Sequence, residues 1–470
     1  MSGLYASLNT TVKALAAQGR GIEIAGKNLS NINNTAYARQ RVVFGDRGTF
    51  VTSNGAESLG LEALSVQQLR DSLVDRQVMR EVALKSGFES EQSAYQRAQA
   101  GLGQSIDRSA SAGSTTEAGD SGISASIDDF FNAFQSFAAR PTDTGERQTL
   151  IQKSEILADR FQLADSRLAQ VQADLGAEVA SDVTEVNRLL SSIAELNGQI
   201  GRFEINAAGS AVDLRDQRQA RLEELSAKMP IEVRDTASGQ VQVFARDADG
   251  AEIPLVNLAT VQGTVAFNGT QITAGSPATT VALGGGSIKG ALTARDGAIQ
   301  TLRNDLDQLA RQLVTSVNAA YNPTGSTGNF FDPAGVAAGS INVVNTLTAS
   351  TLKASDGGAA GENTIALAVA QLANREFSTA GGDHIDGTFA GHFSKTVSKI
   401  GQALAGANSR VEDQSNIERL IRSQRDSLSG VSLDEEMADL MKYQRAFQAS
   451  SRVFNLIDEL LDTVVNGLGR

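Results

Sequence analysis

Few residues of this chain are of the types that carry out nucleophilic, acid–base or metal chemistry. Its 470 residues include no cysteine and only two histidines, His384 and His392, which lie in a glycine-rich stretch. Without cysteine, disulfides and thiolate zinc sites are excluded. Two histidines eight positions apart in such a stretch are typical of a solvated loop. We therefore predict no metal ligand here.

Three consecutive acidic residues, Asp434, Glu435 and Glu436, suggest a metal or acid–base site at first sight. They directly follow Ser432, and Ser432 with Glu435 fits the S-x-x-E capping box that opens a helix. Carboxylates in a first helical turn also stabilise the helix dipole. With no histidine partner nearby, a helix start explains the triplet better. We predict no catalytic, cofactor-binding or metal-binding residue.

An enzyme, such as a secreted hydrolase carried on a structural scaffold, is the alternative from a different functional class. Catalysis would need a nucleophile–base pair or a metal constellation. The segment 231–283 has neither histidine nor cysteine, and its clustered carboxylates, Asp247, Asp249 and Glu252, lie at a predicted hairpin turn. We therefore predict that the chain is not an enzyme.

Apolar residues that recur every seven positions lie at the two ends of the chain. The N-terminal positions are Leu8, Leu15, Ile22 and Leu29, and the C-terminal positions are Leu433, Leu440, Phe447, Phe454, Leu461 and Leu468. A seven-residue repeat keeps one stripe facing a partner helix in a left-handed supercoil. Neither stripe can be buried by its own helix, so each needs the other end or another chain. This pattern indicates assembly.

Charge also favours pairing of the ends. Residues 1–45 contain five basic and one acidic residue, whereas residues 430–470 contain seven acidic and four basic residues. The whole chain has a formal net charge of −13, which argues against binding to nucleic acid or acidic lipid. The longest clean apolar run, 365–370, is far shorter than the ~20 residues that span a membrane. Residues 1–17 lack the apolar core of a signal peptide.

Periodicity predicts a mainly α protein with an inserted β domain. We expect helices at about 3–32, 65–105, 127–139, 146–203, 212–228, 288–321, 362–374, 389–428 and from 432 onwards. Residues 231–283 alternate apolar and polar side chains between turn signals, which indicates strands. We expect 39–44 to be extended, 49–60 and 107–122 to be loops, and 340–353 to form a short strand pair.

The expected domains follow from these elements. Residues 1–45 with 430–470 form a terminal coiled-coil domain, 46–230 with 285–429 form a helical-bundle middle domain, and 231–284 form a small outer β domain. A chain of this length exceeds a single compact core, so several domains are expected.

Residues 27–40 resemble the N-terminal signature of bacterial flagellar axial proteins, through Asn28, Asn31, Tyr37, Arg39 and Gln40. The Tyr-x-Arg-Gln ending resembles the hook-associated protein 1 family, whose members form the first hook–filament junction. The stretch 430–450 resembles the same family, through Asp434, Glu435, Glu436 and Gln444. So do 214–218, 305–310, 317–318 and 328–331. The resemblance covers roughly the whole chain except the β insert.

Two features complicate this resemblance. Ala36 stands where the family has glycine before the tyrosine, so we expect the positive-φ position to move to Asn33 or Asn34. Residues 444–452 also resemble hook and rod proteins, which makes a hook or rod protein the alternative. The acidic triplet, the Tyr-x-Arg-Gln ending and the long 146–203 helix favour the junction family.

The resemblance implies a structural component of the flagellum. Members are exported unfolded by the flagellar type III system without a cleaved signal peptide, and lie outside the cell. They assemble with copies of themselves at the distal end of the hook, next to the hook protein and the second junction protein. Before export, a small helical chaperone holds their C-terminal helix. No cofactor, nucleic acid or membrane insertion is implied.

Overall fold

The fold is described from a computed structural model that covers residues 2–46, 48–52, 55–58, 60–102, 122–326, 328–357, 359 and 361–464. Leu468 and nearly all of the predicted 107–122 loop lie outside these residues. The chain forms two compact units, each assembled from segments far apart in sequence. Unit 1 comprises Met1–Lys85, Val183–Gly286 and Gln414–Arg470, and unit 2 comprises Ser86–Asp182 and Ser287–Asp413. The three domain ranges expected above stay a prediction.

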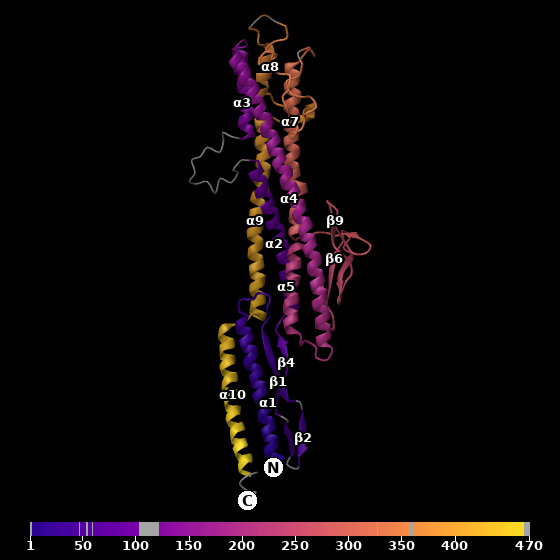
Figure 1. The fold of residues 1–470 in the computed structure, drawn as a ribbon, viewed down its shortest axis with the longest axis vertical. Helices are drawn as coiled ribbons and strands as arrows, with labels where there is room; N and C mark the ends of the chain where they lie inside the picture. The colour runs from indigo at the N-terminus through magenta and orange to yellow at the C-terminus, as the bar shows by residue number, and fades with distance from the viewer. Residues whose placement is uncertain are drawn as a thin grey trace. The chain divides into compact units, whose positions relative to one another are not determined.

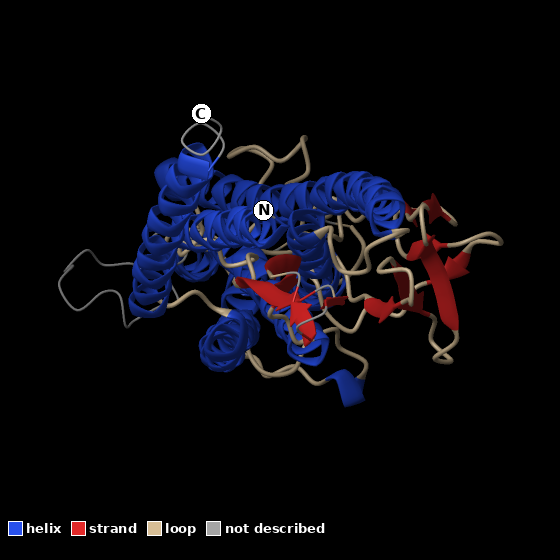
Figure 2. Cartoon of the chain, turned by 90° about the horizontal axis from the view of Figure 1, so that it is seen from below, coloured by secondary structure: helices blue, strands red, loops and turns tan. Residues whose placement is uncertain are grey.

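Helix is the main secondary structure, as Figure 2 shows in blue, which confirms the predicted fold class. The α-helices are α1 (Ser2–Ser30), α2 (Ser72–Gly101), α3 (Ile123–Ala139), α4 (Thr144–Glu204), α5 (Val212–Lys228), α6 (Ser287–Thr293), α7 (Gln300–Tyr321), α8 (Thr364–Gln371), α9 (Phe389–Ser429) and α10 (Leu433–Asp462). A π-helical segment, Ala294–Ile299, joins α6 to α7. Short 3-10 turns occupy Leu372–Asn374 and Thr379–Gly381.

The long helices lie where the apolar spacing predicts them. The predicted helix 212–228 has the same bounds as α5, and 146–203 matches α4 within two residues at each end. Along α4, apolar side chains at helical spacing are buried from Leu157 to Ile193, and Val171 among them is half-buried. The helix predicted at 288–321 contains the π-helical segment, which apolar spacing does not reveal.

In unit 1, α1 packs against α10 on one side and against a pair of strands on the other. Figure 1 shows α1 in indigo beside α10 in yellow. Strand β1 (Gln40–Asp46) pairs antiparallel with β4 (Leu61–Gln68), and the connection between them folds as a second hairpin, β2 (Thr49–Thr52) with β3 (Gly55–Ser58).

Two predictions for this region are wrong. Residues 49–60 contain the β2–β3 hairpin rather than a plain loop, and residues 65–68 belong to β4 rather than to a helix. The physical reason is pairing: β4 exists because β1 supplies its hydrogen-bond partners, from Gln40 opposite Gln68 onwards. Helix α2 begins at Ser72, where the carboxylate of Asp71 accepts hydrogen bonds from the backbone N–H groups of Leu73 and Val74.

The predicted β insert of unit 1 is confirmed. It holds two antiparallel sheets, in the order β5–β6–β7–β8 and β11–β10–β9. Their bounds are β5 (Glu232–Asp235), β6 (Val241–Arg246), β7 (Glu252–Asn257), β8 (Thr260–Val261), β9 (Ala266–Phe267), β10 (Ile272–Ala274) and β11 (Thr279–Thr280). Gly250 turns the β6–β7 hairpin at a φ of +83°, which glycine adopts without steric strain.

In unit 2, the phenylalanines of α3 meet an aromatic pair from the loop after α7. Phe130 lies 5.9 Å from Phe330 and 5.7 Å from Phe331 between ring centroids, and Phe131 stacks on Phe389 of α9 at 5.5 Å. Phe130, Phe330 and Phe331 are fully buried. These rings form the centre of the unit 2 core.

The strand pair predicted at 340–353 is wrong. Among the described residues, this stretch contains turns and one isolated bridge between Phe331 and Val343. Local hydrogen bonds from Thr348 and Thr351 close successive turns, for example from Thr351 Oγ1 to the carbonyl of Thr346 at 3.0 Å. Threonine hydroxyls compete with strand pairing in this way.

Candidate functional site: the paired chain ends and their polar closure

The two ends of the chain form an antiparallel coiled coil, which confirms the predicted pairing of α1 with α10. Asn28, near the end of α1, contacts Glu436 at the start of α10, and Gly21 faces Tyr443 about two turns further along. A side chain at position 21 would come within 2.8 Å of the tyrosine ring, so glycine is required for this close approach. Two runs of less exposed positions on α10 follow alternating steps of four and three: Glu436, Leu440 and Tyr443, and then Ser450, Phe454, Ile457 and Leu461. The exposed Phe447 lies between the two runs.

The residues of the predicted stripes are placed unequally. Leu8, Leu15, Ile22 and Leu29 of α1 are all half-buried, as are Leu440, Phe454 and Leu461 of α10. Phe447 remains 39% exposed and Leu433 55% exposed. On α1, the most buried positions are instead small or polar: Thr11, Ala17, Gly21, Ala25 and Asn28, together with Ile24. A search for large apolar residues misses such positions.

Much apolar surface of α10 is not covered by α1. Six side chains of this helix are between 45% and 58% exposed: Leu433, Met437, Met441, Val453, Leu456 and Leu460. They flank the stripe that faces α1. A helix with apolar side chains on more than one face has capacity to pack against more than one partner.

Where the end of α1 meets the start of α10, Asn28, Tyr37, Arg39, Gln40 and Glu436 form a network of hydrogen bonds, here called the polar closure. Asn28 is its centre. Its amide group donates to the carbonyl of Gln40 at 2.8 Å and to the carboxylate of Glu436 at 2.9 Å. Its side-chain oxygen accepts from the Tyr37 hydroxyl at 2.7 Å and from the Gln40 backbone N–H at 3.0 Å. Asn28 is 1% exposed, so all its hydrogen-bonding capacity is used inside the protein. Burial and nearby carboxylates raise the pKa of Tyr37, which keeps its hydroxyl a donor.

Arg39 attaches this closure to the start of α10. Its guanidinium donates to Glu436 at 2.6 Å, pairs with Glu435, and lies 3.6 Å from Asp439. Partial burial lowers the pKa of Arg39, but the carboxylates of Glu436 and Glu435 outweigh this effect and the net pKa is raised. The backbone N–H of Arg39 also donates to the carbonyl of Ser429 at 2.8 Å, at the end of α9.

The charge pairing of the chain ends is thus concentrated at one residue. Among the described contacts, Arg39 alone of the basic side chains in residues 1–45 pairs with the C-terminal segment. Lys13 pairs with Glu62, Arg20 with Glu23, and Lys27 with Asp213. The net charges of the two ends indicate attraction but do not identify this partner.

The predicted capping box at the start of α10 is wrong. Ser432 is the residue before the helix, but its side chain makes no capping hydrogen bond. The physical reason is competition, because Arg39 pairs with Glu435, which would otherwise bond back to Ser432.

The predicted shift of a positive φ to Asn33 or Asn34 is also wrong. Leu258 is the non-glycine residue with positive φ in the part of the chain that the structure describes. The exit from α1 is closed by hydrogen bonds instead: Asn34 accepts from the N–H of Ala36 with its side chain and from the N–H of Tyr37 with its carbonyl. Ala36 therefore occupies ordinary backbone space.

Three residues of this site were not singled out as site residues from the sequence. Asp216 of α5 accepts from the N–H of Ala38 at 3.2 Å and from Arg70 at 2.6 Å. Arg425 of α9 donates to the carbonyl of Thr35 at 2.6 Å, which fixes the same loop from the other side. The stretch 214–218 belongs to the family resemblance, and this was the available signal for Asp216.

The remaining signature residues are peripheral. The Asn31 side chain donates to the carbonyl of Lys27 at 3.0 Å, which closes the last turn of α1. Asp434 and Gln444 are exposed on α10.

The carboxylates of the β insert, whose residue types could take part in catalysis, make structural hydrogen bonds and ion pairs instead. Asp247 accepts from the backbone N–H groups of Asp249 and Ala251 inside the β6–β7 turn, and Glu252 pairs with Arg234. Burial lowers the pKa of His392. Across the described residues, histidines and carboxylates form no cluster suited to a metal ion. Within the same residues, every helix is too short or too polar to cross a membrane.

Comparison with known proteins finds similarity to flagellar proteins. The family model for the flagellar hook-associated protein FlgK helical domain matches residues 113–331, and the model for the flagellar basal body rod FlgEFG protein C-terminal region matches residues 422–468. The solved structure of the flagellar hook junction protein FlgK from Burkholderia pseudomallei aligns with 55% of this chain and 46% of its own, at 21% identity and a TM-score of 0.46.

Three relatives that align along nearly their full length are all named flagellar hook-associated protein 1. Flagellar hook-associated protein 1 of Bacillus subtilis strain 168 is 26% identical over 100% of this chain and 99% of its own length. Its namesakes from Salmonella typhimurium LT2 and Escherichia coli K12 are 23% and 22% identical, each over 98% of this chain and 99% of their own. These matches confirm the resemblance to hook-associated protein 1 along the chain, and the homologues indicate a flagellar hook-associated junction protein.

Proposed function

We propose that this chain joins the hook to the filament by assembling with copies of itself at the distal end of the hook. The exposed apolar face of α10 carries the proposal. Pairing with α1 leaves Leu456 58% exposed and Leu460 47% exposed on a helix already held by Arg39. Burial of one leucine side chain contributes about 1.5–3 kcal/mol, so contacts with neighbouring copies would bury this surface favourably. Of the predicted stripes, Leu433 and Phe447 are exposed and would join this interface, whereas the half-buried positions pair α1 with α10.

The proposal also includes the export route of the chain and its neighbours in the flagellum. The chain leaves the cell through the flagellar type III system without a cleaved signal peptide, and an export chaperone covers α10 beforehand. The absence of cysteine suits passage through a narrow channel, since no disulfide can form. In the flagellum its neighbours are the hook protein and the second junction protein.

The substitution Leu456→Glu tests the assembly face. We expect the free energy of unfolding of the variant monomer to lie within about 0.5 kcal/mol of the wild-type value, because the side chain is exposed. We also expect it to reach the culture medium but to support no filament growth on hooks, since a buried charge would oppose contact between copies. Gln448→Glu, at another exposed position of α10, is the control and should support filaments. Normal filament growth with Leu456→Glu would refute the proposal.

A hook or rod protein is the second candidate, because the C-terminal match is to a rod-protein model. The position of the labelled protein separates the two functions. A thin band between hook and filament supports the junction, whereas label along the hook or rod supports the alternative.

A further inference from the structure

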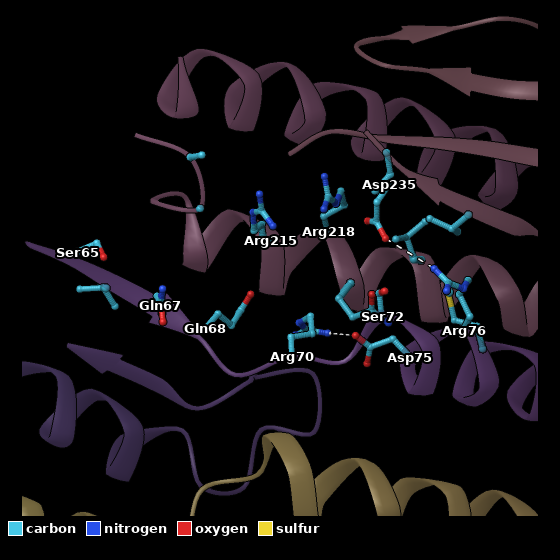
Figure 3. Close-up of a pocket in the computed structure, with 18 residues that line it drawn as sticks. Ser65, Gln67, Gln68, Arg70, Ser72, Asp75, Arg76, Arg215, Arg218 and Asp235 are labelled. Atoms are coloured by element: carbon cyan, nitrogen blue, oxygen red, sulfur yellow. Dashed lines mark hydrogen bonds and ion pairs between the residues drawn. The ribbon is translucent and has the colours of Figure 1, made fainter. Parts of the chain in front are cut away.

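A cavity in unit 1 contains a buried arginine without a carboxylate partner. The cavity has a volume of about 430 Å³ and lies between the connection from β4 to α2, helix α5 and strands β5 and β6. Arg218 of α5 lines it and is only 6% exposed. Figure 3 shows Arg218 next to Arg215 on this helix, with Arg70, Asp75, Arg76 and Asp235 around the same space.

The hydrogen bonds of Arg218 leave one edge of its guanidinium unused. Its Nη1 donates to the side-chain oxygen of Asn197 and to the carbonyl of Gly239, both at 2.9 Å. Among the described residues, its Nε and Nη2 have no acceptor, and no carboxylate lies within ion-pair distance. Burial, and then the charge of Arg215, lower the pKa of Arg218 to about 10, so the side chain is still protonated at neutral pH.

The neighbouring charges are already compensated. Arg215 makes two parallel bonds to Glu204, at 2.8 and 2.6 Å. The two carboxylates that line the cavity are both engaged, since Asp75 accepts from Arg70 at 2.9 Å and Asp235 lies 3.7 Å from Arg76. Arg218 is therefore the arginine of this cavity that has no carboxylate in direct contact, although the charges of Asp235 and Glu204 act on it from beyond ion-pair distance. A buried cation without a counter-charge is costly, and an anion that reaches it would gain a charge-assisted bond in a partly desolvated site.

We propose that this cavity binds a small oxyanion on the Nε–Nη2 edge of Arg218. These two nitrogens present parallel N–H donors whose spacing matches two oxygens of a phosphate or a carboxylate. Arg215, three residues earlier on the same face of α5, adds positive potential. The proposal is independent of the junction function, because none of these residues belongs to the α1–α10 pair.

Thermal unfolding of the full chain tests this site. Sodium phosphate should raise the unfolding temperature of wild type above that in sodium chloride of equal ionic strength, because an anion that binds the folded state stabilises it. Arg218→Met should remove the rise, and Arg218→Lys should weaken phosphate binding about tenfold or more, since lysine lacks the planar fork. Arg221→Met, an exposed arginine of α5 paired with Glu224, is the matched control and should respond like wild type.

Circular dichroism of each variant without phosphate shows whether that variant is folded. If Arg218→Met is unfolded, Arg218→Lys is used in its place. No rise in wild type, or an equal rise in the folded Arg218 variant, would overturn the site. Acetate and sedimentation velocity separate two sources of the anion. Binding of phosphate with an unchanged oligomeric state indicates a free oxyanion. If acetate binds and any oligomers dissociate, acetate has displaced a carboxylate side chain of another copy from the same Nε–Nη2 edge of Arg218.

Discussion

The two units of this protein bring distant parts of the chain together by opposite chemistry. In unit 2, Phe130 and Phe134 of α3 pack against Phe330 at ring-centroid distances of 5.9 and 5.2 Å. In unit 1, Asn28, Arg39 and Glu436 meet through hydrogen bonds and ion pairs. Apolar contact is non-directional, whereas each of these polar bonds requires one partner in one geometry.

This difference indicates separate roles for the two regions. The aromatic cluster supplies free energy of folding, since aromatic rings bury large areas. The polar closure contributes less net energy, because its groups exchange bonds with water for bonds with each other. It determines instead where α10 begins and which side of that helix faces α1. In the proposed assembly through α10, this orientation would decide which apolar side chains remain available to other copies.

The largest effect is expected in the aromatic cluster. Phe130→Ala should lower the free energy of unfolding by about 3–5 kcal/mol, because the ring is fully buried and a cavity would remain. Urea unfolding followed by circular dichroism measures the change. Phe203→Ala, at a position 68% exposed, is the control and should have little effect. A loss below about 1 kcal/mol for Phe130→Ala would show that the aromatic cluster is not the energetic centre.

The next effect tests the polar closure. Asn28→Asp replaces the amide donor by a second carboxylate facing Glu436, so a hydrogen bond becomes a repulsion between buried charges. We expect a loss of about 2–3 kcal/mol and faster proteolysis of α10, because a buried group loses its partner. Asn33→Asp at an exposed position is the control. Equal proteolysis of the two variants would mean that the closure does not hold α10.

A smaller effect should appear as pH dependence of unit 1. Burial raises the pKa of Asp216 to about 6, although Arg70 opposes this shift. The unfolded carboxyl titrates near 3.9, so the folded state binds the proton more tightly. The contribution of Asp216 is therefore largest at low pH and is lost as pH rises through 6, by about 1 kcal/mol between pH 5 and pH 7.

Asp216→Asn should remove this dependence. Urea unfolding of both proteins at pH 5, 6 and 7 measures the difference in slope. Since Glu204, Asp213 and Glu418 have lowered pKa values, their contributions change below this range and should be the same in both proteins. Identical slopes would mean that Arg70 keeps Asp216 ionised throughout.

The sequence predicts the elements that depend on their own periodicity. Helices α4 and α5 are predictable because their apolar spacing and the Met229–Pro230 stop are local. Strand β4 is not, because its stability comes from pairing with β1. Gly21 was missed for a related reason, since its importance lies in the ring of Tyr443, more than 400 residues away.

The polar closure was predictable only in part. The signature residues Asn28, Tyr37, Arg39 and Glu436 were identified by resemblance, and the opposite charges of the chain ends were visible. The partners were not visible, because Asp216 and Arg425 reach the loop 35–38 from helices whose positions depend on the fold. Long-range polar contacts have no periodicity that a single sequence displays.

The smallest effect distinguishes the predicted capping box from the observed closure. Ser432 makes no capping hydrogen bond, and Glu435 pairs with Arg39 instead. Ser432→Ala should therefore change the free energy of unfolding by less than about 0.5 kcal/mol, whereas loss of a formed N-cap typically costs about 1 kcal/mol. The same substitution is also measured by chemical unfolding in a protein that carries Arg39→Met. There Glu435 is released, the capping box can form, and the cost of Ser432→Ala should rise toward about 1 kcal/mol. An equal cost in both backgrounds would show that Arg39 does not compete with the cap for Glu435.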